Sequence, residues 1–359
     1  MNNIINTFVP QEYTILEDVS SSNNKSRPWK DKKIKSELVA QSYDRLGNVR
    51  KSFKLRECGS FLEFKRFLSD DSLKLNKANF CKVRLCPLCS WRRSLKIFGQ
   101  VSKVMDEAVK DSENQFLFLT LTVRNCRGSE LPQALDMMLK GYDYIFKRSK
   151  VKKSILGSFR ALEITHNTDV NSESFDTYHP HFHCVLMVKK SYFHKNYITQ
   201  NEWSELWKHS IKADYKPIVH IQKIENSDKN IKKAVAETAK YSVKDSDLLN
   251  ENIELQDSAI SILDDALFNR RLISFRGEFS KIKQKLQLDD AIDGDLIHCD
   301  GNEELRQDLD FVIERYSWHI GYYQYIKIDR DYGGQGAREP GGRGTCGAGP
   351  RHGVKIRRV

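Results

Sequence analysis

The sequence predicts an α+β fold, a central antiparallel sheet with helices packed on one side, together with a small zinc-binding segment. Strand-like and helix-like runs alternate along residues 115–244. Two consecutive strand-like runs are joined by a polar connection, which favours antiparallel pairing. Four cysteines lie between residues 58 and 89, a clustering typical of a metal site in a reducing compartment.

The first part of the chain is dominated by polar and charged residues. We expect residues 1–55 to form a flexible basic arm, since they offer few apolar residues for a core. Residues 56–110 are expected to form the cysteine-rich zinc-binding segment and a helix that ends near Lys110.

Residues 111–250 are expected to form the main domain. "QFLFLTLTV", 115–123, is apolar and β-branched, as in a buried strand. Apolar residues then recur at helical spacing from Leu131 to Phe146, with Ser129 as a plausible N-cap. "SFRALEITHN", 158–167, and "HPHFHCVLMV", 179–188, are expected to form an antiparallel hairpin.

The same domain continues with three further elements. "TQNE", 199–202, is a capping box that opens a helix. "IVHIQKI", 218–224, resembles another strand, and Ser227 is expected to cap a helix from about Asp228 to Lys244. The resulting β-α-β-β-α-β-α order suggests a mostly antiparallel sheet.

The pattern weakens after residue 250. A helix near residues 262–270 and an aromatic strand or hairpin at 316–328 are expected within a C-terminal region, 251–330. Residues 331–359 are rich in glycine and arginine and suggest a disordered tail, for whose Cys346 we expect no metal role.

The charge of the chain favours a polyanionic partner. Fifty-nine Lys and Arg residues against 48 Asp and Glu give a net charge of +11, which suits nucleic acid, although a scattered positive surface is the alternative. We expect no membrane partner and a cytoplasmic location, since we find no membrane-spanning apolar run and no signal peptide.

Three histidines alternate along one predicted strand. His179, His181 and His183 share one face, and apolar residues occupy the other. If the apolar faces of the two hairpin strands align, Glu163 lies within reach of His181 and His183. Two imidazoles and a carboxylate form an open site for a divalent metal such as Mn²⁺, Mg²⁺ or Zn²⁺. His179 precedes Pro180 and is expected to support the ligands; surface histidines are the alternative.

Glu237, Tyr241 and Lys244 are spaced by four and three residues on the predicted helix after Ser227. A nearby lysine favours the phenolate form of tyrosine, which would activate Tyr241 as a nucleophile. An ordinary exposed helix face is the alternative, and the pattern gains weight only beside the metal site.

The cysteines occur as C-x4-C-x2-C, formed by Cys81, Cys86 and Cys89, with Cys58 available as a fourth thiolate. Four thiolates would close a tetrahedral structural zinc site, although buried free cysteines are the alternative. Residues that flank the cluster could contact DNA or form a solvated face; they are Arg84, Trp91, Arg92 and Arg93.

Four stretches in one order resemble the HUH endonucleases, most closely the rolling-circle replication initiator (Rep) proteins of small plasmids from Gram-positive bacteria. The stretches are "FLFLTLTVRN", "RALEITHN", "YHPHFHCVLMV" and "ETAKYSVKDSD", and the resemblance covers about residues 55–250. It implies the HUH endonuclease fold for residues 111–250. Similar cysteine spacing also occurs in that family.

By this resemblance, His181, His183 and Glu163 are the metal ligands and Tyr241 is the nucleophile. Such proteins nick one strand of a plasmid double-strand origin, keep the 5′ phosphate on tyrosine, and leave a 3′ hydroxyl for priming. Glu237 resembles a base that activates water to end the cycle. The resemblance also implies host helicase and DNA polymerase as partners and allows a homodimer.

Two other hypotheses remain open. One is a non-catalytic zinc-ribbon DNA-binding regulator, in which the histidines and Tyr241 are structural. The other is a different HUH enzyme, either a transposase or a relaxase, although relaxases usually have their tyrosine before the histidines. Part of the origin is expected to be recognised by residues 251–330.

Overall fold

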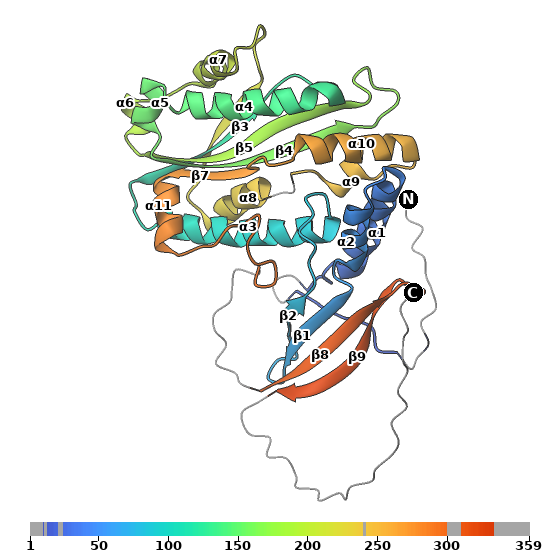
Figure 1. Cartoon of the computed structure of the whole chain (residues 1–359). Helices are drawn as coiled ribbons and strands as arrows, with labels where there is room; N and C mark the ends of the chain where they lie inside the picture. Colours follow the sequence, from blue (N-terminus) through green and yellow to red (C-terminus); the bar gives the residue numbers. More distant parts are fainter. Residues whose placement is uncertain (1–9, 11–12, 21–23, 240–241, 300–309, 334–359) are drawn as a thin grey trace, which may run out of the picture.

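The computed structural model describes residue 10 and residues 13–20, 24–239, 242–299 and 310–333. Within these residues the chain forms two antiparallel sheets with helices packed against them (Figure 1). The helices are α1 (Trp29–Arg45), α2 (Val49–Glu57), α3 (Pro87–Ala108), the 3-10 turn η1 (Gly128–Glu130), α4 (Leu131–Ile145), α5 (Ser149–Ser154), α6 (Tyr192–Lys195), α7 (Gln200–Ile211), α8 (Asp228–Thr238), α9 (Asp245–Leu248), α10 (Ile253–Ala266) and α11 (Glu278–Lys285).

The larger sheet has the strand order β6-β3-β5-β4-β7 in the described part of the chain. Its strands are β3 (Asn114–Thr122), β4 (Gly157–Asn167), β5 (Thr177–Lys189), β6 (Val219–Ile224) and β7 (Ile273–Gly277). The α+β class is confirmed, and so are the predicted strands that became β3 to β6 and the β4-β5 hairpin. The predicted capping box is also present, formed by Thr199 and Glu202 at the start of α7.

Helices cover both faces of this sheet, whereas the sequence predicted them on one side (Figure 1). On one face, Phe182 and Leu186 pack in the same core as residues of α4 and α7. On the other face, Val185 and Met187 pack with α3 and α8. This explains the unbroken apolar run of β5, because a strand that is buried on both faces needs apolar side chains on both.

The expectation of a flexible arm over residues 1–55 is wrong for residues 29–55, which form α1 and most of α2. Trp29 and Tyr43 are almost completely buried, and Trp29 packs edge-on against Trp91 at 4.7 Å between ring centroids. Lys33 is also buried and pairs with Glu37. Residues 1–9, 11–12 and 21–23 lie outside the described residues, so the expectation is untested there.

The expected boundary at residue 250 does not divide the structure. β7 pairs with β4 and so extends the larger sheet. The second sheet, in the order β2-β1-β8-β9, joins the early strands β1 (Phe61–Phe67) and β2 (Leu73–Ala78) to the late strands β8 (Phe311–His319) and β9 (Gln324–Gly333). The aromatic hairpin was predicted, but its long-range pairing with β1 was not, because sequence patterns show only local partners.

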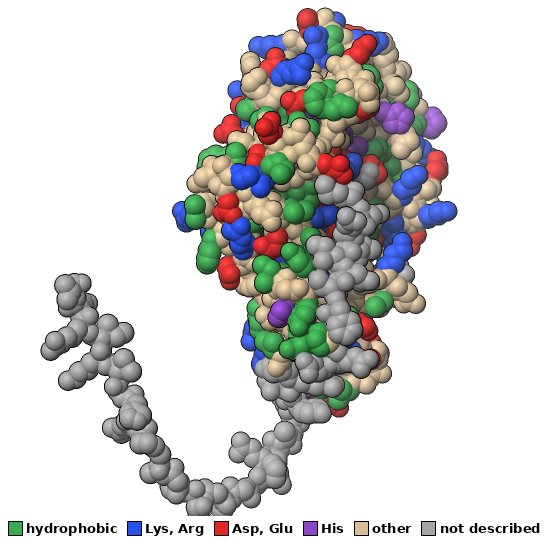
Figure 2. Space-filling view, turned by 90° about the vertical axis from the view of Figure 1, so that its right-hand side faces the viewer, with side chains coloured by type: hydrophobic (Ala, Val, Ile, Leu, Met, Phe, Trp, Pro, Cys, Tyr) green, Lys and Arg blue, Asp and Glu red, His purple; other side chains and the backbone are tan. Residues whose placement is uncertain are grey.

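The surface and the chain ends add three observations. Figure 2 shows Lys and Arg interspersed with Asp and Glu on one face, while several histidines gather in its upper part. Among the described residues, no helix is long and apolar enough to cross a membrane.

The predicted tail is outside the described residues from 334 onward, Cys346 included, and residues 331–333 belong to β9.

Candidate active site and metal centres

The β4-β5 hairpin brings together the three residues predicted as metal ligands. Glu163 pairs directly with His181, and Ala161 pairs with His183, so all three polar side chains lie on one face. Nε2 of His183 is 3.0 Å and Nε2 of His181 is 3.4 Å from Oε2 of Glu163. Ligand atoms roughly 2.1 Å from one ion stand about 3 to 3.4 Å apart, so this spacing fits a shared cation. We call these residues the HHE cluster.

The chemistry of the donor set also fits a cation. Nδ1 of His181 lies 3.2 Å from the carbonyl oxygen of His179. If Nδ1–H donates to that oxygen, Nε2 of His181 is a bare acceptor and faces a carboxylate oxygen of Glu163. Two facing acceptors repel unless a cation lies between them. The backbone of His179 therefore supports the orientation of His181, as metal-binding histidines commonly require.

Among the described residues, Lys244 supplies a cation that contacts the cluster directly. Its Nζ lies 2.7 Å from Oε1 of Glu163. Burial raises the pKa of Glu163, but without metal the hydrogen bonds from Lys244 and from His181 and His183 in their doubly protonated form outweigh it, so that pKa is far below its ordinary value. The bond to Glu163 raises the pKa of Lys244 in return. Glu163 is thus held as a carboxylate that has one oxygen on Lys244 and the other on the histidines.

The expected helix from Asp228 to Lys244 is shorter in the structure. Ser227 caps it as predicted, but α8 ends at Thr238, and Lys244 is the N-cap of α9. The chain leaves the helical conformation because the carbonyl of Ser242 accepts a hydrogen bond from the N–H of Ile164, which extends the edge of β4. Ser129 is likewise not the predicted N-cap of α4, because it belongs to the 3-10 turn η1.

Tyr241, the predicted nucleophile, lies outside the described residues. Two described residues that follow it in the sequence are tied to β4: the carbonyl of Ser242 accepts from the N–H of Ile164, and Lys244 bonds to Glu163 of the HHE cluster. Asp247 strengthens this connection, because its carboxylate accepts from the backbone N–H groups of Lys244 and His166. Glu237 is half-buried near the end of α8, and its charge contributes to the raised pKa of Lys244.

The four predicted zinc ligands converge into a second cluster. Cys58 ends α2, Cys81 follows β2, and Cys86 and Cys89 lie at the start of α3. The Sγ atom of Cys58 is 3.4 Å from that of Cys89 and 3.6 Å from that of Cys86, and the Sγ atoms of Cys81 and Cys89 are 3.7 Å apart. Four sulfurs at about 2.3 Å from one zinc ion have nearly these separations, so the cluster could bind a metal.

The surroundings of the cysteine cluster favour bound metal over free thiols. The neighbouring thiols, with burial, raise the pKa of Cys58 well above its ordinary value, which a central cation would reverse. Backbone N–H groups of Cys81 and Lys82 donate to the sulfurs of Cys58 and Cys89. Gly59 has a φ of +63°, and an added Cβ would lie 2.3 Å from Leu88, so the turn after Cys58 requires glycine.

Three of the four predicted DNA contacts are wrong, because Trp91, Arg92 and Arg93 are buried. Arg92 donates to the carbonyl oxygens of Leu296 and Ile297. Arg93 donates to the carbonyls of Lys82, Val83 and Ile292.

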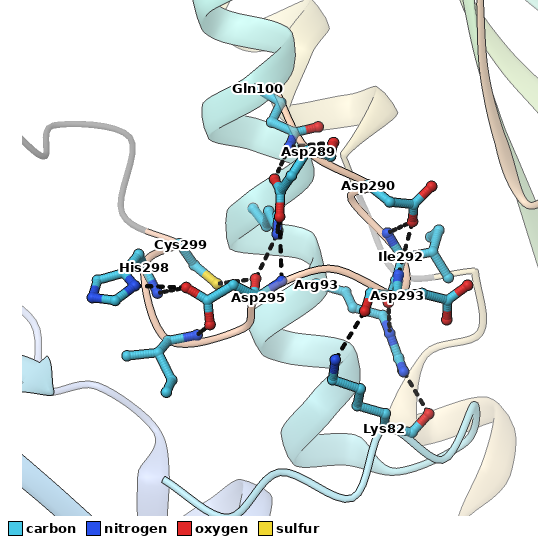
Figure 3. A network of polar contacts seen from close by, with 12 residues as sticks. Lys82, Arg93, Gln100, Asp289, Asp290, Ile292, Asp293, Asp295, His298 and Cys299 are labelled. Carbon is cyan, nitrogen blue, oxygen red and sulfur yellow. Dashed lines mark hydrogen bonds and ion pairs between the residues drawn. The ribbon is translucent and has the colours of Figure 1, made fainter. Parts of the chain in front are cut away.

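These arginines help to fasten residues 289–299 to α3, as Figure 3 shows for Arg93. Gln100 donates to Asp289, and Lys82 donates to the carbonyl of Asp293. The sequence shows no sign of this role, since the acceptors of Arg92 and Arg93 within residues 289–299 are backbone groups about 200 residues away. Arg84 differs from the other three residues, because it is only partly buried; its Nη1 has no hydrogen-bond partner among the described residues.

Comparisons with known proteins show the family of the chain. Residues 72–326 match the family described as "Replication protein". The chain is 41% identical over 338 residues to "Protein rep" of Bacillus amyloliquefaciens, covering 88% of this chain and 98% of that protein. It is 38% identical over 299 residues to "Protein rep" of Streptococcus pneumoniae, covering 81% and 90%. No solved structure matches this chain.

Proposed function

The chain belongs to the Replication protein family (Rep_1) of plasmid replication proteins, and we propose that it starts rolling-circle replication by nicking one strand of a plasmid double-strand origin. The observation that supports this most is the HHE cluster, an open site for a divalent metal that is contacted by Lys244. Lys244 follows the candidate nucleophile Tyr241 by three residues in the sequence.

Glu163, His181 and His183 would hold a divalent ion, Mn²⁺ or Mg²⁺. When bound, this ion would offset charge on the scissile phosphate and help to orient it. The described residues fix the orientation and the positions of these three side chains. The backbone of His179 orients His181, and the β4-β5 pairing fixes the positions of Glu163 and the histidines, so little reorganisation is needed when DNA binds.

In the proposed reaction, the phenolate oxygen of Tyr241 attacks the scissile phosphorus. A new bond joins this oxygen to phosphorus, and the bond from phosphorus to the 3′ oxygen breaks. The departing 3′ oxygen takes a proton and becomes the hydroxyl that primes synthesis. One phosphodiester replaces another, so the strand can be rejoined later without an external energy source. Lys244 would help to anchor the segment after Tyr241 through its bond to Glu163.

Glu237 is proposed to act at the end of the cycle. A water molecule that loses its proton to this carboxylate would attack the phosphotyrosine, release the phenol and leave a 5′ phosphate on the DNA. Hydrolysis would end the cycle without a second tyrosine. The proposed partners are single-stranded or cruciform DNA at the nick site, host helicase and DNA polymerase, with a homodimer as an open expectation.

The four-cysteine cluster is proposed to hold structural zinc. It joins the end of α2, the loop after β2 and the start of α3, and all four thiolates would be ligands, which leaves no open position for substrate.

The test incubates purified protein with Mn²⁺ and supercoiled plasmid that contains its cognate origin. We expect nicked circles and a protein-DNA adduct that survives denaturant, and we expect Tyr241→Phe to lose both. Tyr144→Phe is the matched control, because Tyr144 is a tyrosine 43% exposed on α4. Origin binding without nicking by the wild-type protein would instead support the non-catalytic regulator.

A further inference from the structure

A half-open cavity lies between the start of α3 and the segment that follows α8. Its free volume is about 30 Å³, which is room for one or two groups the size of a water molecule or a carbonyl oxygen. We call it the Arg84 cavity, after the guanidinium group in its wall. Most of the lining is aliphatic, including Leu85, Ile97, Val243, Leu248, Leu267 and Leu272.

Arg84 is the unusual group in this wall. Its Nη1 atom is completely buried and has no hydrogen-bond partner among the described residues. A buried donor without an acceptor is energetically unfavourable, and more so when it is charged. Arg93 lines the same cavity, but its guanidinium donates to three carbonyl oxygens. Of the two arginines that line this cavity, Arg84 is the one with a buried donor that has no partner among the described residues.

The cavity also offers hydrogen-bond acceptors, so its polar groups suit a neutral polar ligand as well as an anion. Ser90 donates its hydroxyl hydrogen to the carbonyl of Arg84, and Ser94 donates to the carbonyl of Trp91. Their oxygens remain available as acceptors. None of the described residues that line the cavity is a carboxylate, so a ligand meets the free guanidinium donor of Arg84, small hydroxyl acceptors and aliphatic walls.

The Arg84 cavity is close to the proposed reaction centre along the chain. Ser242 and Val243 belong to its lining and directly follow Tyr241 in sequence. The next residue, Lys244, bonds to Glu163 of the HHE cluster. A DNA strand whose phosphate lies at that cluster would therefore bring neighbouring nucleotides near the cavity.

We propose that the Arg84 cavity binds the edge of one unpaired base of the nicked strand, with Arg84 donating to a carbonyl oxygen of that base. Guanine is the first choice, since arginine pairs well with its O6 and N7 atoms, whereas adenine has no carbonyl. A phosphate fits less well, because the aliphatic walls would desolvate its charge without enough donors. This inference rests on the proposed nicking function and adds sequence recognition beside the nick.

The test uses the full-length protein and a pool of single-stranded DNA with a randomised core. Bound DNA is captured and sequenced for the wild-type protein, Arg84→Met and Arg84→Lys. We expect a wild-type preference of about ten-fold or more for guanine over adenine at one position. Arg84→Met should lose that preference at that position alone. Arg84→Lys should lose most of it, because lysine lacks the planar pair of donors.

Arg50→Met is the matched control, since it removes an exposed arginine of α2 and should leave every preference unchanged. Thermal unfolding and zinc content identify any variant that misfolds. An unchanged base preference in Arg84→Met would overturn the proposal. So would a uniform loss of affinity with a weaker salt dependence, which indicates a phosphate contact. Denaturant-resistant adducts in the same samples test nicking separately, because base preference is measured from binding alone.

Discussion

The HHE cluster and the four-cysteine cluster differ in how completely the protein encloses them. The cysteine cluster offers four sulfurs from three segments, and Cys58, Cys86 and Cys89 are fully buried. The HHE cluster offers three ligand atoms from one hairpin, and the side chains of His181 and His183 remain 12% and 11% exposed. A closed set of four thiolates is typical of structural zinc, whereas three ligands leave a position for substrate.

The two clusters also differ in their electrostatic surroundings. The HHE cluster lies on a hydrogen-bonded hairpin and is contacted by Lys244, so the strands that carry it should form without a metal. In the cysteine cluster the neighbouring thiols raise the pKa of Cys58, so a bound metal should stabilise its thiolate form. One cluster should therefore determine stability and the other activity.

The largest expected effect is on folding. Cys89→Ser removes one of the four thiolates and should lower the free energy of unfolding by about 4 kcal/mol or more, since a structural zinc site contributes on the order of 10 kcal/mol. Chemical denaturation and zinc content by mass spectrometry measure this. Cys126→Ser is the control, because Cys126 lies outside the cluster. If the Cys89→Ser protein were as stable as the control, the structural role assigned to the cysteine cluster would be wrong.

The next effect is on activity alone. His181→Ala should reduce the rate of origin nicking about a thousand-fold, because a lost metal interaction costs several kcal/mol in the transition state. The free energy of unfolding should change by less than about 1 kcal/mol, as for an ordinary surface change. His209→Ala, on the exposed surface of α7, should change neither quantity. Loss of folding in His181→Ala would assign a structural role to the HHE cluster.

A smaller effect concerns pH. The pKa of Glu163 is lowered in the folded protein, so its carboxylate contributes stability above its ordinary value of 4.5, and this is lost as pH falls below it. In chelator-treated protein, Glu163→Gln should reduce stability by about 1.5 kcal/mol at pH 7. The difference from wild type should shrink toward pH 3 in urea denaturation. Glu113→Gln, an exposed change, is the control, and a difference independent of pH would contradict this account.

The smallest effect concerns the affinity of the HHE cluster for a metal. Lys244→Met removes a cation that lies against Glu163, so the Kd for Mn²⁺ should fall roughly five-fold, by about 1 kcal/mol of removed repulsion. Nicking should decrease at the same time, because the segment after Tyr241 loses this anchor. Lys244→Arg should keep both properties near wild type. Calorimetry of Mn²⁺ binding checks this, and weaker binding in Lys244→Met would count against the proposed competition.

The larger sheet was predictable because its signals are local. The strands β3 to β6 are apolar runs between polar segments, and the aligned apolar faces of β4 and β5 placed Glu163 opposite His181. The cysteine cluster was predictable from spacing alone. In both cases the residues that decide the structure are few and close in sequence, or are distinctive residue types.

The missed features depend on partners far along the chain. Lys32 lies in an α1 face that appeared too polar to bury, but its ammonium group pairs with Asp245. Arg92 and Arg93 resembled DNA contacts because their acceptors, the backbone carbonyls of residues 292–297, have no signature in the sequence. The end of α8 was missed because the edge of β4 competes for the backbone of Ser242.

The central claim is that Tyr241 reacts at a phosphate held by the HHE cluster. The most direct measurement is mass spectrometry of the peptide that remains joined to DNA after nicking with Mn²⁺ and nuclease digestion. The account predicts a nucleotide remnant on Tyr241, and its loss in His181→Ala. A remnant on any other residue, or nicked DNA without a covalent adduct, would contradict it.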